Sequence, residues 1–249
     1  MRAIVAALLL LAALRLVATA APLSAQEPLA EARGASSSMF SAAIFRSLVI
    51  PVRPAVLQGL HQAELAGSRL PAGTLRFTRT WKVEKDARSR LLDSLFRTSP
   101  DPEAREAIEE SVTGGDPWRE FDQTLTFAGY SSSNLADVTT AYYVITWQVV
   151  SGEQAIDFLP GIRRVRDSVA LALLHDPGVA ALSDAEKQEA AVVMAYKAIV
   201  AAHRARELRR SNDRSGLARL RQEVRDSVVR GQGVDLAALR LTNLGFVAD

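Results

Sequence analysis

The sequence predicts an all-α protein: a single helical-bundle domain of about six helices after a cleaved signal peptide. Apolar residues recur at helical spacing in successive segments, helix start and stop signals separate those segments, and no alternating strand pattern of useful length occurs. We therefore divide the chain into a signal peptide (1–25), a flexible or partly helical N-terminal segment (26–74) and an all-α domain (75–249).

The N-terminus has the three parts of a secretory signal peptide. Arg2 supplies the positive charge, Ala3–Leu14 is unbroken apolar sequence, and Leu23–Ala25 ends in small residues that suit a signal peptidase. The apolar run is shorter than the roughly 20 residues that span a bilayer, and Arg15 interrupts it. We expect export to the periplasm or extracellular space without stable membrane insertion after cleavage. Cleavage after Ala20 and an uncleaved anchor are the alternatives.

The predicted helices begin after a leader without a clear pattern. Residues 26–38 are small and polar, and residues 39–71 mix helical spacing with several Pro and Gly residues. The first strong helix follows, with apolar residues every fourth position at Val83, Ala87, Leu91 and Leu95. Two further helices start at Asp-Pro pairs, Asp101–Pro102 and Asp116–Pro117, in which Asp suits the N-cap and Pro the first helical position.

Two segments are apolar nearly all round and are expected at the centre of the domain. The first is Leu135–Val150, with Asn134 as its N-cap and Gly152 at its end. The second is Ala190–Ala202, in a long helix opened by a capping box of Ser183 and Glu186.

Amphipathic patterns at 161–175 and 213–230 predict two more helices, and an apolar tail at 236–246 is expected to dock on the core.

Charge and cysteine content exclude several classes of function. The full chain has 30 basic and 28 acidic residues, but removal of Arg2 and Arg15 with the signal leaves 28 of each. Overall charge therefore does not favour nucleic acid as a partner. The charges are divided, with a net −7 over 83–153 and a net +5 over 160–231, which favours packing between the halves or homo-oligomerisation. Without cysteine, disulfides and thiolate chemistry are excluded.

No sequence motif identifies a catalytic or metal site, and we assign no catalytic residues, no metal ligands and no cofactors. The chain has no Gly-x-Ser-x-Gly nucleophile motif. His61, His175 and His203 stand apart from one another and lack the spacing of a helical zinc site.

Three aromatic residues on one predicted helix, Tyr142, Tyr143 and Trp147, are the candidate ligand-binding residues. Tyr and Trp combine large apolar surfaces with a polar group, which suits a small-ligand pocket. Tyr143 and Trp147 lie one turn apart and are able to stack. The alternative is that all three pack in the core.

Three sequence blocks resemble a family of exported bacterial proteins. The blocks are Tyr130–Asp137 with Tyr142, Tyr143 and Trp147; Leu182–Glu189; and the closing stretch from Asp235 to Phe246. Together they resemble domain of unknown function 6683 over roughly Leu75 to Phe246. The resemblance implies an exported helical protein and supplies no activity or catalytic residues.

These observations favour a non-enzymatic binding or interaction module of the bacterial envelope, whose partner is an unknown protein or small ligand. An alternative is an envelope-polymer hydrolase that uses dispersed carboxylates such as Asp137 and an aromatic cleft at Tyr142 and Trp147. That alternative requires these rings to line an open groove. A second alternative is an oligomeric structural protein.

Overall fold

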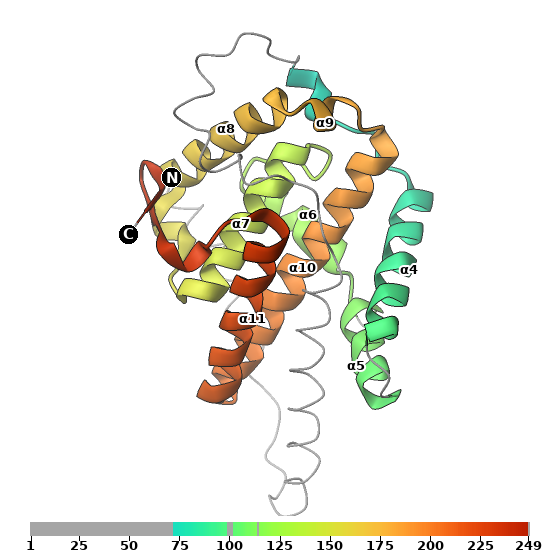
Figure 1. Ribbon diagram of the computed structural model, residues 1–249, viewed down its shortest axis with the longest axis vertical. Helices are drawn as coiled ribbons and strands as arrows, with labels where there is room; N and C mark the ends of the chain where they lie inside the picture. Colours follow the sequence, from blue (N-terminus) through green and yellow to red (C-terminus); the bar gives the residue numbers. More distant parts are fainter. Residues whose placement is uncertain (1–71, 99–101, 114, 249) are drawn as a thin grey trace, which may run out of the picture. The chain divides into compact units, whose positions relative to one another are not determined.

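The computed structural model describes residues 72–98, 102–113 and 115–248 (Figure 1). The longer helices are α4 (Trp81–Thr98), α5 (Pro102–Thr113), α6 (Pro117–Phe127), α7 (Leu135–Ser151), α8 (Leu159–His175), α10 (Asp184–Arg210) and α11 (Arg214–Gln232). The short elements are the 3-10 turns η3 (Ala72–Leu75), η4 (Ala155–Phe158) and η5 (Leu236–Ala238), the helix α9 (Pro177–Ala180), and the strands β1 (Leu239–Thr242) and β2 (Gly245–Ala248). The all-α prediction is confirmed.

Helices α7 and α10 form the centre of the described chain, as their apolar sequences predict. They pack against each other more extensively than any other pair of described elements. Figure 1 shows α10 between α4 on one side and α7 with α11 on the other. The residues from Ala191 to Ala201 on α10 are all buried, so this stretch is enclosed on every side.

Helix ends lie where local side-chain chemistry predicts them. Asp116 and Asn134 accept hydrogen bonds from backbone N–H groups in the first turns of α6 and α7. Ser183 and Glu186 form the predicted capping box of α10. Gly152 ends α7 in the left-handed conformation, with φ of 83°. These five residues therefore fix the start of α6, both ends of α7 and the start of α10.

The C-terminal tail forms an antiparallel β-hairpin that the sequence analysis did not predict. Strands β1 and β2 pair in register from Leu239 opposite Ala248 to Thr242 opposite Gly245. The hairpin packs on α8 so closely that a Cβ atom at Gly161 would lie 1.7 Å from the Thr242 carbonyl oxygen. Docking of the tail on the core is confirmed by Leu241, which is fully buried, whereas Leu244 at the turn is exposed.

The signal peptide prediction (1–25) lies outside the described residues, as does the predicted N-terminal segment up to residue 71. Residues 72–74, which we had placed in that segment, begin η3. The chain then runs extended from Arg76 to Thr80 before α4 starts at Trp81.

Candidate functional site

A pocket of about 540 Å³ lies at the N-terminal end of α7. It is lined by the extended segment before α4, the loop between α6 and α7, and one turn each of α7 and α8. The lining residues are Arg76, Phe77, Gly129, Tyr130, Ser131, Ser133, Asn134, Asp137 and Arg166. Its volume lies within the range of about 300–1,000 Å³ that is usual for small-molecule sites.

The loop that forms one wall of the pocket is fixed at its first residues by a Schellman motif. The N–H of Gly129 donates to the Thr126 carbonyl at 3.0 Å, and the N–H of Tyr130 donates to the Leu125 carbonyl at 2.9 Å. Gly129 has φ of 78°, which glycine adopts without the strain that a side chain would bring. The motif turns the chain sharply after α6 and places the Tyr130 ring at the pocket.

The far end of the same loop is fixed by the N-cap of α7. Asn134 Oδ1 accepts a hydrogen bond from the N–H of Ala136 at 3.0 Å. The Asn134 side chain is only 9% exposed. Since its oxygen is used in capping, its Nδ2 amide is left as a donor at the pocket wall.

Asp137 and Arg166 form an ion pair across the base of the pocket. Asp137 Oδ1 accepts from Arg166 Nε at 2.8 Å, and Oδ2 accepts from the N–H of Ser131 at 3.0 Å. Asp137 is 5% exposed, whereas the Arg166 side chain is one-third exposed and extends to the pocket surface. The carboxylate is therefore neutralised in place, and it holds both the loop and the guanidinium group.

A short antiparallel bridge joins the extended segment to this loop. Arg76 pairs with Asn134, and the N–H of Phe77 donates to the Ser133 carbonyl at 3.0 Å. The segment is anchored a few residues further on, where the side-chain amide of Gln188 on α10 exchanges two hydrogen bonds with the backbone of Thr80. Arg76 and Phe77 are thus held at the pocket by bonds on both sides.

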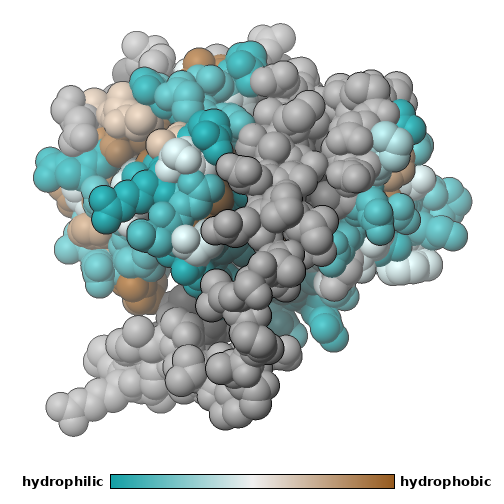
Figure 2. All heavy atoms as spheres, turned by 90° about the horizontal axis from the view of Figure 1, so that it is seen from below, coloured by the Kyte–Doolittle hydropathy of each residue, from teal (hydrophilic) through white to brown (hydrophobic). Residues whose placement is uncertain are grey.

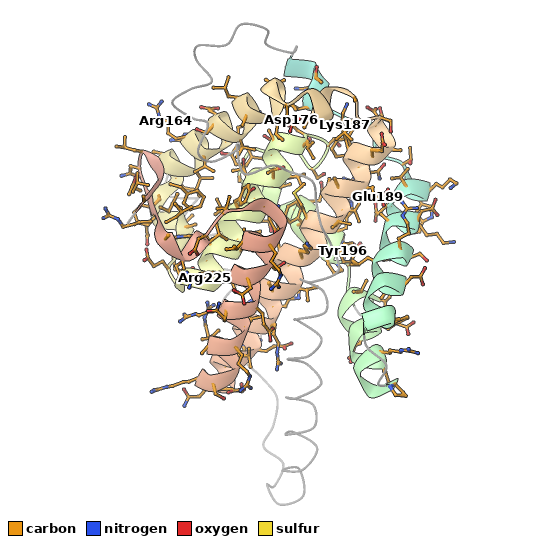
Figure 3. All side chains as sticks on the ribbon, viewed as in Figure 1. Arg164, Asp176, Lys187, Glu189, Tyr196 and Arg225 are labelled. Carbon is orange, nitrogen blue, oxygen red and sulfur yellow. The ribbon has the colours of Figure 1, made fainter. Side chains whose placement is uncertain are left out.

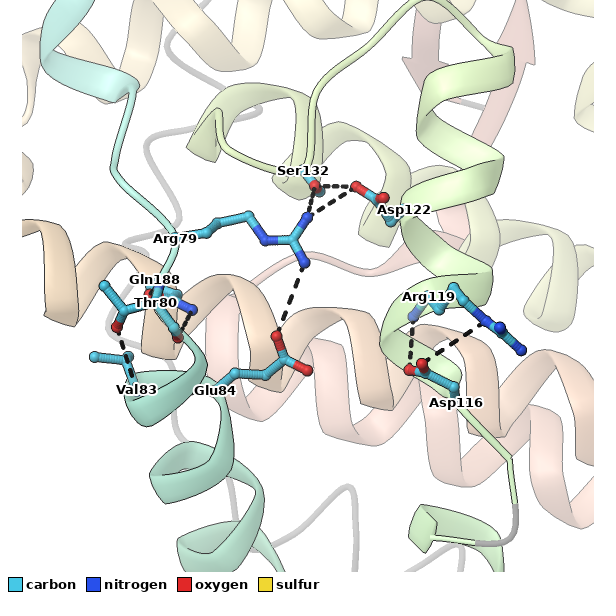
Figure 4. Close-up of polar contacts among 9 residues, drawn as sticks. All are labelled: Arg79, Thr80, Val83, Glu84, Asp116, Arg119, Asp122, Ser132 and Gln188. Atoms are coloured by element: carbon cyan, nitrogen blue, oxygen red, sulfur yellow. Dashed lines mark hydrogen bonds and ion pairs between the residues drawn. The ribbon is translucent and has the colours of Figure 1, made fainter.

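Arg79 supports the loop through Ser132, which is not a lining residue (Figure 4). Its Nη1 atom donates to Ser132 Oγ at 2.9 Å and to Asp122 Oδ1 at 3.1 Å, and the Ser132 hydroxyl in turn donates to Asp122. The Arg79 guanidinium carbon lies 4.8 Å from the ring centroid of Trp118, a cation–π contact. Ser132 therefore faces this network while its neighbours, Ser131 and Ser133, line the pocket.

Tyr130 brings a phenol to the pocket that stays protonated at neutral pH. Burial raises the pKa of the phenol, and the negative charge of Asp137 raises it further, while Arg166 opposes the shift. A protonated phenol donates a hydrogen bond and adds no negative charge.

The three aromatic residues predicted to bind a ligand lie in the core instead of at this pocket. Tyr142 is 1% exposed, and Tyr143 and Trp147 are fully buried. Trp147 Nε1 donates to the Leu239 carbonyl at 2.9 Å, and its ring meets that of Phe246 edge-on at 5.9 Å. Tyr143 contacts Tyr142 at 5.6 Å, so the rings pair differently from the Tyr143–Trp147 stack considered above.

Burial raises the pKa of the phenols of Tyr142 and Tyr143. The same burial leaves no open groove at the rings of Tyr142, Tyr143 and Trp147. The hydrolase alternative thereby loses its aromatic cleft. A ligand-binding role for Tyr142, Tyr143 and Trp147 stays a prediction.

The sequence analysis did not select Arg76, Tyr130, Asn134 or Arg166 as site residues. One signal was present, because the block Tyr130–Asp137 that carries the family resemblance contains five of the lining residues. The sequence does not place Arg76 or Arg166 at this site, since Arg166 meets Asp137 only after α7 and α8 pack together.

Two other ionisable side chains with notable surroundings, His203 and Lys197, lie on α10 and are not part of the pocket lining. His203 on α10 pairs with Glu120 on α6 at 2.7 Å, and this hydrogen bond is the largest cause of the lowered pKa of the Glu120 carboxyl. Lys197 on α10 is 3% exposed, and burial lowers the pKa of its amine to about 7. Within the described residues no group of three or more His, Asp or Glu side chains is placed to hold a metal ion.

In the view of Figure 2, hydrophilic residues cover most of the visible described surface, with hydrophobic residues scattered among them. The exposed large apolar side chains are Trp81, Phe127, Val229 and Leu244. None of the described helices has the length and apolar character needed to cross a membrane.

Comparison with known proteins identifies no relative: no family model, no curated protein and no solved structure matches the chain. The resemblance to domain of unknown function 6683 accordingly stays a prediction.

Proposed function

We propose that this protein is a non-enzymatic binding module that takes a small ligand in the pocket at the start of α7. The observation that carries the proposal is the convergence of donors from three separate elements on one cavity: the segment before α4, the loop between α6 and α7, and α8. Arg76, Tyr130, Asn134 and Arg166 all line it. In small-molecule sites a few convergent polar groups fix the orientation of the ligand.

The same residues favour binding over catalysis. The carboxylate of the pocket, Asp137, is buried and accepts hydrogen bonds at both oxygens, so it is poorly placed to take a proton from a ligand. None of the nine lining residues is a histidine that could activate Ser131 or Ser133 as a nucleophile.

Contacts within the chain hold the pocket walls in place. The Schellman motif and the N-cap hold the two ends of the loop, Asp137 holds its middle through Ser131, and Arg79 holds Ser132. A site whose groups are already ordered loses less conformational entropy on binding, which favours affinity.

A screen of small fragments by two-dimensional NMR tests the proposal. We expect a subset of fragments to shift the amide resonances of Tyr130, Ser133 and Asn134 together. Ser133→Trp, which fills the pocket, should abolish those shifts. Ser89→Trp is the matched control, because Ser89 is exposed on α4 and outside the pocket. Hits that scatter over the surface, or that bind Ser133→Trp as well as wild type, would rule out this function.

We further propose that the module acts outside the cytoplasm, in the bacterial envelope. The support is the signal-peptide pattern of residues 1–25. Expression in a bacterial host should yield periplasmic or secreted protein whose N-terminus, by Edman sequencing, is Gln26 or Ala21. Full-length protein retained in the cytoplasm would contradict export.

A further inference from the structure

We propose that the ligand of the α7 pocket is a small organic anion, with a carboxylate or phosphate group attached to an apolar moiety. This inference rests on the proposed function and specifies its ligand class. It follows from which charges of the pocket are accessible, which neutral donors accompany them, and which surfaces are apolar.

The accessible charges of the pocket are positive. Two guanidinium groups, Arg76 and Arg166, line it with a single carboxylate, Asp137. Asp137 is 5% exposed and already bonded at both oxygens, whereas Arg76 is exposed and the Arg166 side chain is one-third exposed. Among the lining residues a ligand therefore meets two arginines and no unpaired carboxylate, and the exposed Asp167 carboxylate lies beside one of these arginines.

Asp137 also orients the Arg166 guanidinium group so that it can bind an anion. It binds Nε, while the exposed Asp167 carboxylate lies 3.6 Å from Nη1. The remaining N–H groups of the planar fork suit the paired oxygens of a carboxylate or phosphate. The buried acid thus positions the cation without occupying the whole of its hydrogen-bonding edge.

The neutral polar groups of the pocket add donors. Asn134 Nδ2 is left as a donor because Oδ1 caps α7, and the Tyr130 phenol stays protonated. The first turn of α7 lies beside them and carries the positive end of the helix dipole. Each of these groups favours ligand oxygen atoms that carry negative charge.

The half-buried ring of Tyr130 provides the apolar surface of the lining that a ligand can cover, since Phe77 beside it is already buried in the core. A bare inorganic anion would leave the exposed part of the Tyr130 ring uncovered. An anion attached to an apolar group would bury part of it, which adds the hydrophobic contribution that a hydrated ion lacks.

Four small probes test the inference. Each probe has a single aromatic ring, and the probes differ in charge. The probes are benzoate, phenyl phosphate, benzyl alcohol and benzylamine, titrated into the purified protein at low salt by calorimetry and by NMR. We expect one or both anions to bind at least about tenfold more tightly than benzyl alcohol, because each charge-assisted hydrogen bond contributes more than a neutral one. Benzylamine should bind more weakly than the alcohol. Whether benzoate or phenyl phosphate binds more tightly shows whether the pocket prefers a carboxylate or a phosphate group.

Arg76→Gln tests the source of the preference. This substitution should lower the affinity for the two anions about fivefold or more and leave the affinity for benzyl alcohol unchanged. Arg214→Gln is the matched control, since Arg214 is an exposed arginine on α11 outside the pocket. Because Arg166→Gln would leave Asp137 buried without its cation, Arg166 is tested in the double variant Asp137→Asn/Arg166→Gln, which should also lose the anion preference.

The outcomes separate the two proposals. Probes that shift the pocket resonances without regard to charge, or an Arg76→Gln variant with unchanged anion affinity, would overturn the anion assignment and leave the pocket as a binding site. Failure of every probe and every fragment to shift those resonances would overturn the proposed function itself.

Discussion

Asp137 links the pocket to the helical core through a single side chain. It lies in the first turn of α7, is almost fully buried, and joins the loop to α8 through Ser131 and Arg166. A buried carboxylate is stable only where its charge is met by such partners. The residue therefore serves the stability of the fold and the shape of the pocket together.

Replacing Asp137 should have a far larger effect than replacing its exposed neighbour in the same network. We expect Asp137→Asn to lower the free energy of unfolding by about 1.5–3 kcal/mol, because it removes charge-assisted hydrogen bonds at a buried position. Asp167→Asn is the matched control, since Asp167 also faces Arg166 but is 70% exposed, and should cost less than about 0.5 kcal/mol. Urea denaturation measures both, and equal effects would contradict a structural role for Asp137.

Lys197 gives the described core a pH dependence with a defined sign. Its folded pKa of about 7 is below the ordinary value of 10.5, so the unfolded chain binds more protons between these values. Stability should therefore rise with pH from 7 toward 10. In urea denaturation at pH 7, 8 and 9, Lys197→Met should flatten this rise.

The control for loss of one positive charge is Lys82→Met, at a side chain that is 85% exposed. A Lys197→Met variant with the same pH slope as wild type would show that burial of this amine does not set the pH dependence.

At the level of elements, packing between α4 and α10 and between α8 and the hairpin holds the periphery on the central pair. Figure 3 shows Glu189 and Tyr196 on the side of α10 that faces α4, and Glu189 forms an ion pair with Arg90 of α4 at 2.8 Å. The hairpin is held by the Trp147 hydrogen bond to Leu239 and by the close approach of Gly161 to Thr242.

Two glycine substitutions should change stability in opposite directions. Gly161→Ala would place a methyl group against the Thr242 carbonyl, and we expect a loss of about 2 kcal/mol or more because backbone cannot move aside cheaply. Gly231→Ala, near the end of α11 with open space around it, should gain up to about 1 kcal/mol. Thermal unfolding compares the two, and a neutral Gly161→Ala would contradict the tight packing of hairpin on α8.

The elements that the sequence predicted are those fixed by local chemistry. Caps at Asp116, Asn134 and Ser183 bond to backbone two or three residues away, so their pattern is visible along the chain. The hairpin was not predicted because its strands are only four residues long: Leu239–Thr242 alternates apolar and polar residues over too short a run to stand out, and Gly245–Ala248 does not alternate. The pocket was missed because it joins segments distant in sequence, such as Arg166 and Asp137, 29 residues apart.

At the scale of the whole molecule, the described chain is a helical domain built on α7 and α10, with a polar pocket where the central helix α7 begins. Tyr142, Tyr143 and Trp147, on later turns of α7, lie in the core. The two parts of α7 therefore have different roles. Its first turn presents polar groups to the pocket, and its later turns pack in the interior.

A crystal structure of the protein with the tightest-binding fragment from the NMR screen tests the binding function most directly. We expect electron density for the fragment in the α7 pocket, within hydrogen-bonding distance of at least one of Arg76, Tyr130, Asn134 and Arg166. Density for the fragment at another site, with the pocket holding only solvent, would contradict the assignment of this pocket as the ligand site.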